Sequence, residues 1–360
     1  MTAVSICIIG KNEESHVERL FKSIEKSFKD YPHEVLFVDT GSEDDTVKIA
    51  EKYADKVLNF EWIHDFSAAR NFAMENASND AVFFLDCDEE ITYINIEDFG
   101  KAVSDCIEGV GMVRVRNCYV LLGAEDAYTE KRARICNRNN HRFEGKIGER
   151  IIRKKESLPV DYYDVDVTIT HYGFLSIEEG SLMRVERNLP LLLKAVEEQD
   201  VVKDTALYFM LGQHYALLGE TEEASRYMKK GMDETEDDDE SNKLLMALGF
   251  GYTLLHMNNH SDAIELVALS DQYKDSGDFS CLMGIVYQRN GMIDKAMDAF
   301  EAARMSAEVI VEGANTFIPC YNMACIHELY GETDEAMELY ELCEGYGPAE
   351  ERLAELEADV

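Results

Sequence analysis

The first half of the sequence alternates short apolar runs with longer stretches of helical pattern. The runs are rich in β-branched and aromatic residues and occupy residues 4–9, 34–38, 56–59 and 81–85. Runs of this length, alternating with crossover helices, are typical of a mostly parallel sheet whose strands are buried on both faces. We therefore expect an α/β domain, in which ligands bind beyond the carboxyl ends of the strands.

The second half follows a different pattern, in which a small residue precedes an alanine by twelve positions. The four pairs are Gly212 and Ala224, Gly251 and Ala263, Gly284 and Ala296, and Ala324 and Ala336. This pattern resembles the tetratricopeptide repeat, a helix-turn-helix unit of about 34 residues in which small residues let paired helices approach closely. The third and fourth blocks match best, and the second matches least. We predict an α/β domain over residues 1–195 and an all-α repeat domain over residues 196–360.

The charge of the chain excludes one class of function. It has 72 acidic and 35 basic residues, a net charge of −37, and residues 201–360 hold 33 acids and only 10 bases. Because phosphate backbones repel so acidic a chain, we exclude general nucleic-acid binding.

Cysteine usage and hydropathy indicate the compartment. The nine cysteines are odd in number, scattered and without a Cys-x-x-Cys pair, which fits neither a disulfide framework nor a zinc site. No apolar run approaches the ~18 residues of a membrane-spanning helix. We therefore expect a cytoplasmic protein with no insertion into a membrane.

Two carboxylates, Asp86 and Asp88, follow the fourth apolar run. Side chains two positions apart in an extended backbone point the same way, so the pair can converge at the carboxyl edge of the sheet. Converging carboxylates repel unless a cation lies between them, and oxygen ligands suit Mg²⁺ or Mn²⁺. The alternative is a solvated acidic loop, since a chain with 72 acids offers many chance pairs.

Further polar motifs follow the other runs in a fixed order. Asn12-Glu13 comes after the first run, Asp39-Thr40-Gly41-Ser42 after the second, and Arg70-Asn71 before the fourth. Together with the Asp-x-Asp motif they resemble the family 2 glycosyltransferases, which have the Rossmann-like GT-A fold. The resemblance is close over residues 4–92 and looser to about residue 195.

This resemblance implies transfer of a sugar from a nucleotide-diphosphate donor, with a UDP-sugar favoured. It implies that the donor is bound by Asn12, Glu13, Asp39, Arg70 and Asp86. It also implies a divalent metal held by Asp86, Asp88 and His171. An imidazole ligand would move the preference from Mg²⁺ toward Mn²⁺. The alternative for His171 is a structural residue at the end of a strand.

The catalytic residues implied by the family are Asp88 at the metal and Glu149 as general base. Related enzymes commonly have a His-Glu pair where this chain has Gly148-Glu149. Glu144 and Asp126 are therefore alternative bases, and the alternative role for Glu149 is a structural pair with a nearby arginine.

A basic segment surrounds the candidate base. Residues 131–155 hold ten basic and two acidic residues. In so acidic a chain, we expect this segment either to gather an anionic donor or to neutralise the carboxylate-rich edge of the sheet.

The combination of the two domains favours a metal-dependent, inverting glycosyltransferase that acts on a peptide or protein. It is similar to bacterial peptide glycosyltransferases such as the sublancin-type S-glycosyltransferases. One alternative is a cell-surface glycan or lipid-linked acceptor. Another is a degenerate, non-catalytic adaptor that binds nucleotide sugars. The repeats would present the acceptor or, alternatively, serve as a packing scaffold or the surface of a homodimer.

Overall fold

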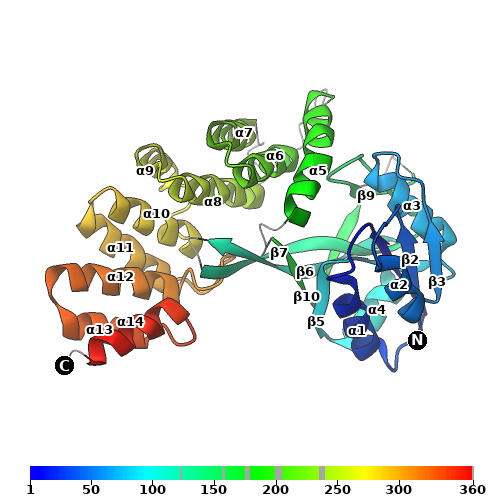
Figure 1. Cartoon of the computed structure of the whole chain (residues 1–360), viewed down its shortest axis with the longest axis horizontal. Helices are drawn as coiled ribbons and strands as arrows, with labels where there is room; N and C mark the ends of the chain where they lie inside the picture. Colours follow the sequence, from blue (N-terminus) through cyan, green and yellow to red (C-terminus); the bar gives the residue numbers. More distant parts are fainter. Residues whose placement is uncertain (122–123, 156–158, 175–178, 199–204, 235–239, 359–360) are drawn as a thin grey trace. The chain divides into compact units, whose positions relative to one another are not determined.

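The structure, a computed structural model, describes residues 1–121, 124–155, 159–174, 179–198, 205–234 and 240–358 (Figure 1). The chain forms two compact units. One consists of residues 1–119 and 129–181, and the other of residues 120–128 and 182–360. The predicted boundary between residues 195 and 196 stays a prediction.

Among the described residues, no helix combines the length and the apolar character needed to cross a membrane. All nine cysteines are free thiols.

The first unit is built on an eight-stranded sheet with the order β3-β2-β1-β4-β7-β6-β10-β5. Its strands are β1 (Val4–Gly10), β2 (His33–Asp39), β3 (Lys56–Asn59), β4 (Ala81–Asp86), β5 (Glu89–Ile94), β6 (Gly109–Leu121), β7 (Ala124–Asn137) and β10 (Asp161–Phe174). β1, β2, β3 and β4 are parallel to one another, whereas β4 pairs with β7, and β10 with β5, in antiparallel fashion. The α/β prediction is confirmed.

Helices cover both faces of this sheet (Figure 1). They are α1 (Val17–Phe28), α2 (Thr46–Tyr53), α3 (Phe66–Asn76) and α4 (Ile96–Asp105), and β8 (His141–Glu144) pairs with β9 (Arg150–Arg153) in a separate hairpin. Along β1, Ile6 and Ile8 pack on the side of α1, α2 and α4, whereas Cys7 and Ile9 pack on the side of α3. Because both faces are buried, the strand sequence is continuously apolar instead of alternating.

A partly buried carboxylate, Glu34, connects the start of β2 to its neighbours. It accepts hydrogen bonds from Ser5 Oγ at 2.6 Å and Ser78 Oγ at 2.7 Å, and it pairs with Lys56 Nζ at 2.8 Å. Burial alone would raise the pKa of Glu34, but the bonds from Lys56, Ser5 and Ser78 outweigh it and lower the pKa to about 2. The ionised carboxylate therefore stabilises the folded sheet.

We predict that Glu34→Gln removes a pH-dependent part of the stability. The folded pKa lies below the unfolded value, so this contribution is present above about pH 5 and is lost as the pH falls toward 2. Urea denaturation should show that the wild type loses about 2–3 kcal/mol more than Glu34→Gln over this interval. The control Glu51→Gln, at an exposed position of α2, should follow the wild-type profile.

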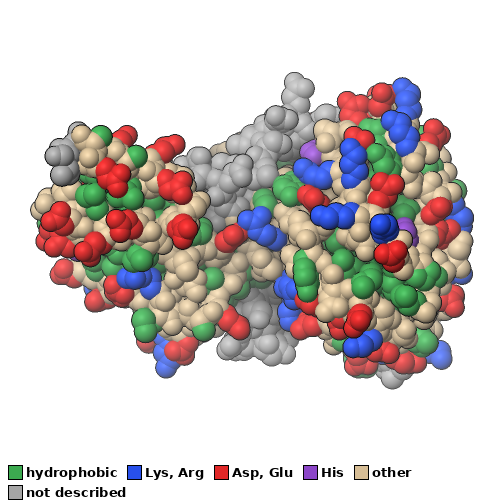
Figure 2. Space-filling model, turned by 90° about the horizontal axis from the view of Figure 1, so that it is seen from below, with side chains coloured by type: hydrophobic (Ala, Val, Ile, Leu, Met, Phe, Trp, Pro, Cys, Tyr) green, Lys and Arg blue, Asp and Glu red, His purple; other side chains and the backbone are tan. Residues whose placement is uncertain are grey.

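The second unit contains paired helices. They are α5 (Glu179–Glu197), α6 (Thr205–Leu217), α7 (Thr221–Glu234), α8 (Glu240–His256), α9 (His260–Ala263) continued by the 3₁₀ helix η1 (Ile264–Leu269), α10 (Gly277–Arg289), α11 (Ile293–Arg304), α12 (Phe317–Tyr330), α13 (Thr333–Glu341) and α14 (Gly347–Ala358). Figure 2 shows acidic side chains spread over the helices on the left. The residues 235–239 of the acidic insertion lie outside the described part of the chain.

Small residues sit where the paired helices cross. A Cβ on Gly212 would lie 2.3 Å from Met228 Cγ, and one on Gly284 would lie 2.5 Å from the Phe300 ring. Such distances leave no room for a side chain, so the spacing of small residues marks close helix crossings as predicted. The second block departs from this regularity because α9 has only four residues before it tightens into η1.

We predict that Gly284→Ala destabilises the helical unit by about 1–3 kcal/mol, since the added methyl group overpacks the Phe300 ring. Gly100→Ala in α4 is the matched control, because its Cβ would meet Tyr31 at an ordinary 3.4 Å. Urea denaturation followed by circular dichroism measures both. Equal effects of the two substitutions would contradict a tight crossing at Gly284.

Candidate active site

The ends of the parallel strands place two predicted site residues on one edge. In the register of the sheet, Gly10 is opposite Asp39 on β2, and Ile9 is opposite Asp86 on β4. The two carboxylates therefore flank the end of β1. A Cβ on Gly10 would lie 2.6 Å from Cys87 Sγ, so the chain packs tightly between them.

The loop after β1 is fastened to the loop after β2. Asn12 has a left-handed backbone with φ of 56°, a conformation that asparagine tolerates. Its side-chain oxygen accepts from Glu43 N at 2.8 Å, and its own N–H donates to Ser42 Oγ at 3.0 Å. Glu13 N donates to Thr46 Oγ1 at 2.7 Å. The Asn-Glu motif therefore fixes the shape of this edge.

The carboxylate of Asp39 is oriented by its own loop. It accepts backbone hydrogen bonds from Gly41 N at 3.1 Å and Ser42 N at 3.0 Å. Gly41 has a φ of 102°, which only glycine adopts easily. Asp39 is also 5% exposed, so its position is set before any ligand binds.

The predicted donor residues Arg70 and Asp86 belong to a buried ionic network. Arg70 donates from Nε to Glu149 Oε1 at 2.5 Å and from Nη2 to Asp86 Oδ1 at 2.8 Å. Arg134 donates to Asp86 Oδ2 at 3.0 Å and also to Glu89. Two guanidinium groups thus hold three carboxylates.

Burial and charge act in opposite directions in this network. Burial would raise the pKa of Asp86, but Arg134 and Arg70 outweigh it and hold that pKa well below its usual value. Burial raises the pKa of Glu89, which is 1% exposed. Glu89 also accepts from Asp86 N at 2.8 Å, so it orients the backbone of the Asp-x-Asp motif.

The residue after Arg70 has a separate, structural role. Asn71 donates from Nδ2 to Phe143 O at 2.9 Å and accepts from Phe143 N at 2.8 Å. The side chain therefore bonds to both backbone groups of Phe143, as the backbone of a neighbouring strand would, and holds β8 against α3. This explains why an Arg-Asn pair occurs here: one side chain enters the network and the other fastens the hairpin that leads to Glu149.

The second carboxylate of the motif faces His171. Asp88 Oδ2 lies 3.3 Å from His171 Nε2, and His171 Nδ1 lies 2.9 Å from Asn117 Oδ1. Because an amide oxygen can only accept, Nδ1 carries the proton and Nε2 is directed at Asp88. Burial lowers the pKa of His171, but Asp88 and Glu89 outweigh it and raise the pKa above its usual value.

Asp86 and Asp88 thus have different partners. Asp86 is turned to the two arginines and Asp88 to His171, so the predicted ligand set does not gather into one cluster. Within the described ranges, no three His, Cys, Asp or Glu side chains are arranged to hold a metal ion. Asp88 and His171 do fit as two ligands, because Asn117 keeps one proton on Nδ1, and a cation would replace the Nε2 proton that faces the carboxylate.

Comparison with known proteins identifies the domain that contains this edge of the sheet. Residues 5–156 match the model of glycosyl transferase family 2, and residues 205–238 match a tetratricopeptide repeat. The chain carries a glycosyltransferase family 2 domain. The chain is 26% identical over 258 residues to the SPbeta prophage-derived glycosyltransferase SunS of Bacillus subtilis, covering 71% of this chain and 59% of that one. This similarity supports the sublancin-type comparison.

A further relative matches a smaller share of the chain, and one solved structure aligns at low identity. A TPR repeat-containing protein of Synechococcus elongatus is 41% identical over 91 residues, which are 25% of this chain and 22% of that protein. The crystal structure of S. aureus TarS aligns with 77% of this chain and 56% of its own at 15% identity, with a TM-score of 0.36. The chain spans less than two thirds of the length of these relatives.

The three candidate bases of the glycosyltransferase domain lie in different surroundings. Glu149 follows Gly148, whose φ is 63°, and its side chain is 13% exposed against Arg70. Glu144 is more than half exposed and pairs with Arg142 at 2.9 Å. Asp126 is on β7, but its side chain lies outside the described residues.

Sequence reasoning did not single out Arg134, Glu89 or Asn117. Arg134 belongs to the basic segment, and its contact with Asp86 favours the second of the two expected roles, neutralisation of the carboxylate-rich edge. Other cations of the segment pair elsewhere, such as Lys131 with Asp164 at 2.6 Å. Asn117 carries no local signal, because only the pairing of β6 with β10 places it beside His171.

We predict that Arg134→Met destabilises the first unit by about 3–5 kcal/mol, because it leaves the buried carboxylate of Glu89 without its guanidinium partner. Lys131→Met on the same strand removes an exposed pair and should cost less than about 1 kcal/mol. Adding Glu89→Gln to Arg134→Met should restore part of the loss. Urea denaturation measures all three, and equal losses for the two single variants would contradict the buried network.

Proposed function

We propose that this protein transfers a sugar from a nucleotide-diphosphate donor to a peptide or protein acceptor. The observation that carries the proposal is the pairing of Asp88 with His171 next to the Arg70–Asp86–Arg134 network, at the strand edge of a family 2 domain. A carboxylate with an imidazole suits a divalent cation, and buried guanidinium groups suit phosphate.

We assign the donor to the edge formed by the ends of β1, β2 and β4. Asp39, Asn12 and Glu13 would bind the nucleoside of a UDP-sugar. Arg70 Nη1 is buried without a hydrogen-bond partner among the described residues, so it offers a donor for a diphosphate oxygen. Asp86 would hold Arg70 in place and approach the ribose side of the donor.

Asp88 and His171 would hold Mn²⁺ or Mg²⁺, with further ligands from the diphosphate. When bound, the cation stabilises the negative charge that develops on the leaving nucleoside diphosphate. Asn117 orients His171, and Glu130 Oε1 accepts from Asn117 Nδ2 at 2.8 Å. This chain of contacts keeps the ring fixed in the tautomer that a metal requires.

We assign Glu149 as the base that takes the acceptor proton in an inverting displacement. Its Oε1 accepts a hydrogen bond from Arg70 Nε at 2.5 Å, which fixes the direction of the carboxylate. The same arginine links the base to Asp86, so Arg70 would align the donor side of the site with the base.

The acceptor assignment rests on the similarity to SunS and on the helical repeats. Stacked helix pairs form extended surfaces that suit peptides and proteins. Assembly of two copies through these repeats is part of the proposal, and sedimentation velocity tests it separately from activity.

The metal assignment predicts that Asp88→Ala abolishes the Mn²⁺-dependent gain in UDP-sugar affinity. Isothermal titration calorimetry with and without Mn²⁺ measures this gain. Asp164→Ala, which removes an exposed carboxylate of β10, is the control and should behave as the wild type. Undiminished Mn²⁺ dependence in Asp88→Ala would overturn the metal assignment.

The base assignment predicts that Glu149→Gln lowers turnover with a hydroxyl acceptor by about 10²–10⁴-fold while donor binding persists. A thiol acceptor should suffer less, because a cysteine is partly ionised near neutral pH. Glu144→Gln is the matched control at an exposed position. Wild-type turnover in Glu149→Gln with a hydroxyl acceptor would move the assignment to another acid.

A further inference from the structure

Tyr172, the residue after His171 on β10, bonds to the acidic turn at two points. Its backbone N–H donates to Asp88 O at 3.0 Å, and its phenolic O–H donates to Glu90 Oε2 at 3.0 Å. Because β10 pairs with β5 up to His171 opposite Glu89, the first bond extends this pairing by one residue to Asp88. Tyr172 therefore fixes the segment that carries Asp88 against the strand that carries His171.

Helix α1 covers the Tyr172 ring with a guanidinium group. Arg19 Cζ lies 3.9 Å from the centroid of the ring, which is within the range of a cation–π contact. One turn farther along the same helix, Ser23 Oγ accepts a hydrogen bond from Ile91 N of β5 at 3.1 Å. Arg19 and Ser23 are thus successive contacts of α1 with the β5–β10 pair, and the ring of Tyr172 is held from the side of the helix.

The position of Arg19 carries a cost in stability. Its Nε and Nη2 atoms are buried and have no hydrogen-bond partner among the described residues. A buried N–H group without a partner destabilises the fold, because it has lost its hydrogen bonds to water. Departures of this kind are expected where a site needs a defined geometry more than it needs stability. Arg19 is therefore a candidate for a role in the site next to it.

The candidate metal site depends on the match between two segments of the chain. Asp88 lies in the turn between β4 and β5, whereas His171 lies on β10, and their side chains approach to 3.3 Å. Groups that orient metal ligands change the affinity for the metal by about 10–100-fold. Asn117 orients the imidazole, and Tyr172 fixes the backbone of the carboxylate, so each of the two ligands has a support of its own.

We propose that Tyr172 and Arg19 are positioning residues for the metal site. Tyr172 clamps the backbone that carries Asp88, and Arg19 holds the Tyr172 ring in place. Both act through the position of Asp88 and need no contact with the cation. This inference rests on the proposed function and deepens it, because it names the groups that set the geometry of the site before a cation binds.

The first test uses the full chain without metal or nucleotide. Hydrogen exchange at the amide of residue 172 should be at least about tenfold faster in Tyr172→Phe and in Arg19→Met than in the wild type, since the bond to Asp88 O opens more often. Tyr93→Phe is the matched control, because Tyr93 donates to Asp166 Oδ2 at 3.1 Å on the same pair of strands but is 50% exposed. Exchange in this control should stay within about twofold of the wild type.

The second test measures UDP binding with and without Mn²⁺ by isothermal titration calorimetry. Tyr172→Phe and Arg19→Met should each reduce the Mn²⁺-dependent gain in affinity at least about tenfold, while UDP affinity without metal stays within about twofold of the wild type. A general loss of structure would weaken both affinities, so this difference identifies a positioning role. Arg19→Lys keeps a cation over the ring and should retain more of the gain than Arg19→Met.

The results separate this inference from the proposed function. An undiminished Mn²⁺ gain in Tyr172→Phe or in Arg19→Met would overturn the role of that residue, and so would wild-type exchange at residue 172. Equal losses in Tyr93→Phe would overturn both roles. In each case the metal assignment stands as long as the wild type gains affinity with Mn²⁺. A wild type without any gain would instead overturn the metal assignment itself.

Discussion

The compensation of buried charge by Arg70 and Arg134 is the constraint on which the rest of the site depends. Asp86 and Glu89 are brought together by a sharp connection between β4 and β5, and two such carboxylates would repel each other strongly in the interior. The guanidinium groups remove this repulsion with hydrogen bonds to both acids. The Asp-x-Asp motif can therefore lie at a buried edge, where the surrounding protein strengthens every electrostatic contact with a bound anion.

The same network separates the roles of neighbouring residues. Because the arginines engage Asp86, the carboxylate of Asp88 is left to face His171, and Tyr172 N donates to Asp88 O at 3.0 Å to hold the backbone there. The pairing of β10 with β5 and β6 sets Asn117 behind the imidazole. In the function proposed above, one carboxylate paired with guanidinium groups and another paired with an imidazole would place the phosphate and metal contacts side by side.

The parts of the fold that follow from local pattern could be predicted from the sequence. The strands β1 and β4 are almost continuously apolar because both faces are covered, and the small residues at Gly212 and Gly284 mark contacts that exclude any side chain. The partner of Asp86 could not be predicted, because Arg134 lies 48 residues away on a strand reached only through the sheet topology. Ion pairs between distant strands leave no periodic signal in the sequence.

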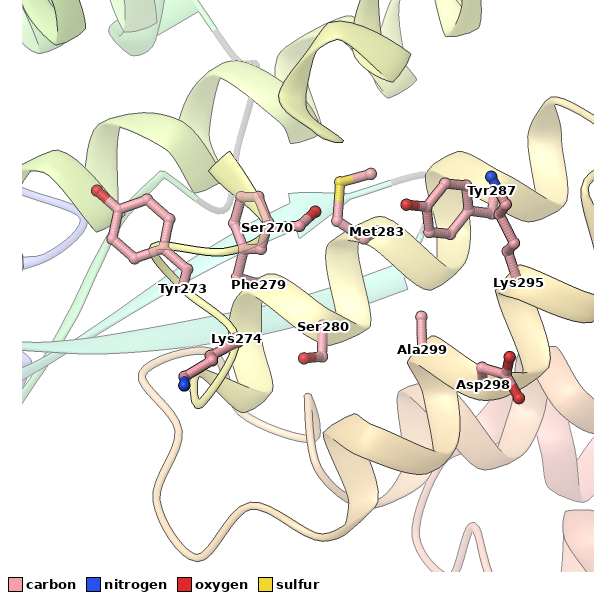
Figure 3. Close-up of a pocket in the computed structure, with 10 residues that line it drawn as sticks. All are labelled: Ser270, Tyr273, Lys274, Phe279, Ser280, Met283, Tyr287, Lys295, Asp298 and Ala299. Atoms are coloured by element: carbon pink, nitrogen blue, oxygen red, sulfur yellow. The ribbon is translucent and has the colours of Figure 1, made fainter. Parts of the chain in front are cut away.

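The second repeat shows that the twelve-residue spacing does not guarantee a regular pair of helices. Gly251 and Ala263 keep the twelve-residue interval, and a Cβ on Gly251 would lie 2.8 Å from Leu266 Cδ1 of η1, so the two segments of this repeat do approach closely. That contact fixes the distance between the two segments at one point only. The length of the helix depends on the residues that follow, and here Ile264–Leu269 tightens into a 3₁₀ helix. Packing at the crossing is thus compatible with an irregular segment farther along, which contributes Ser270 and Tyr273 to the lining of a cavity beside α10 (Figure 3).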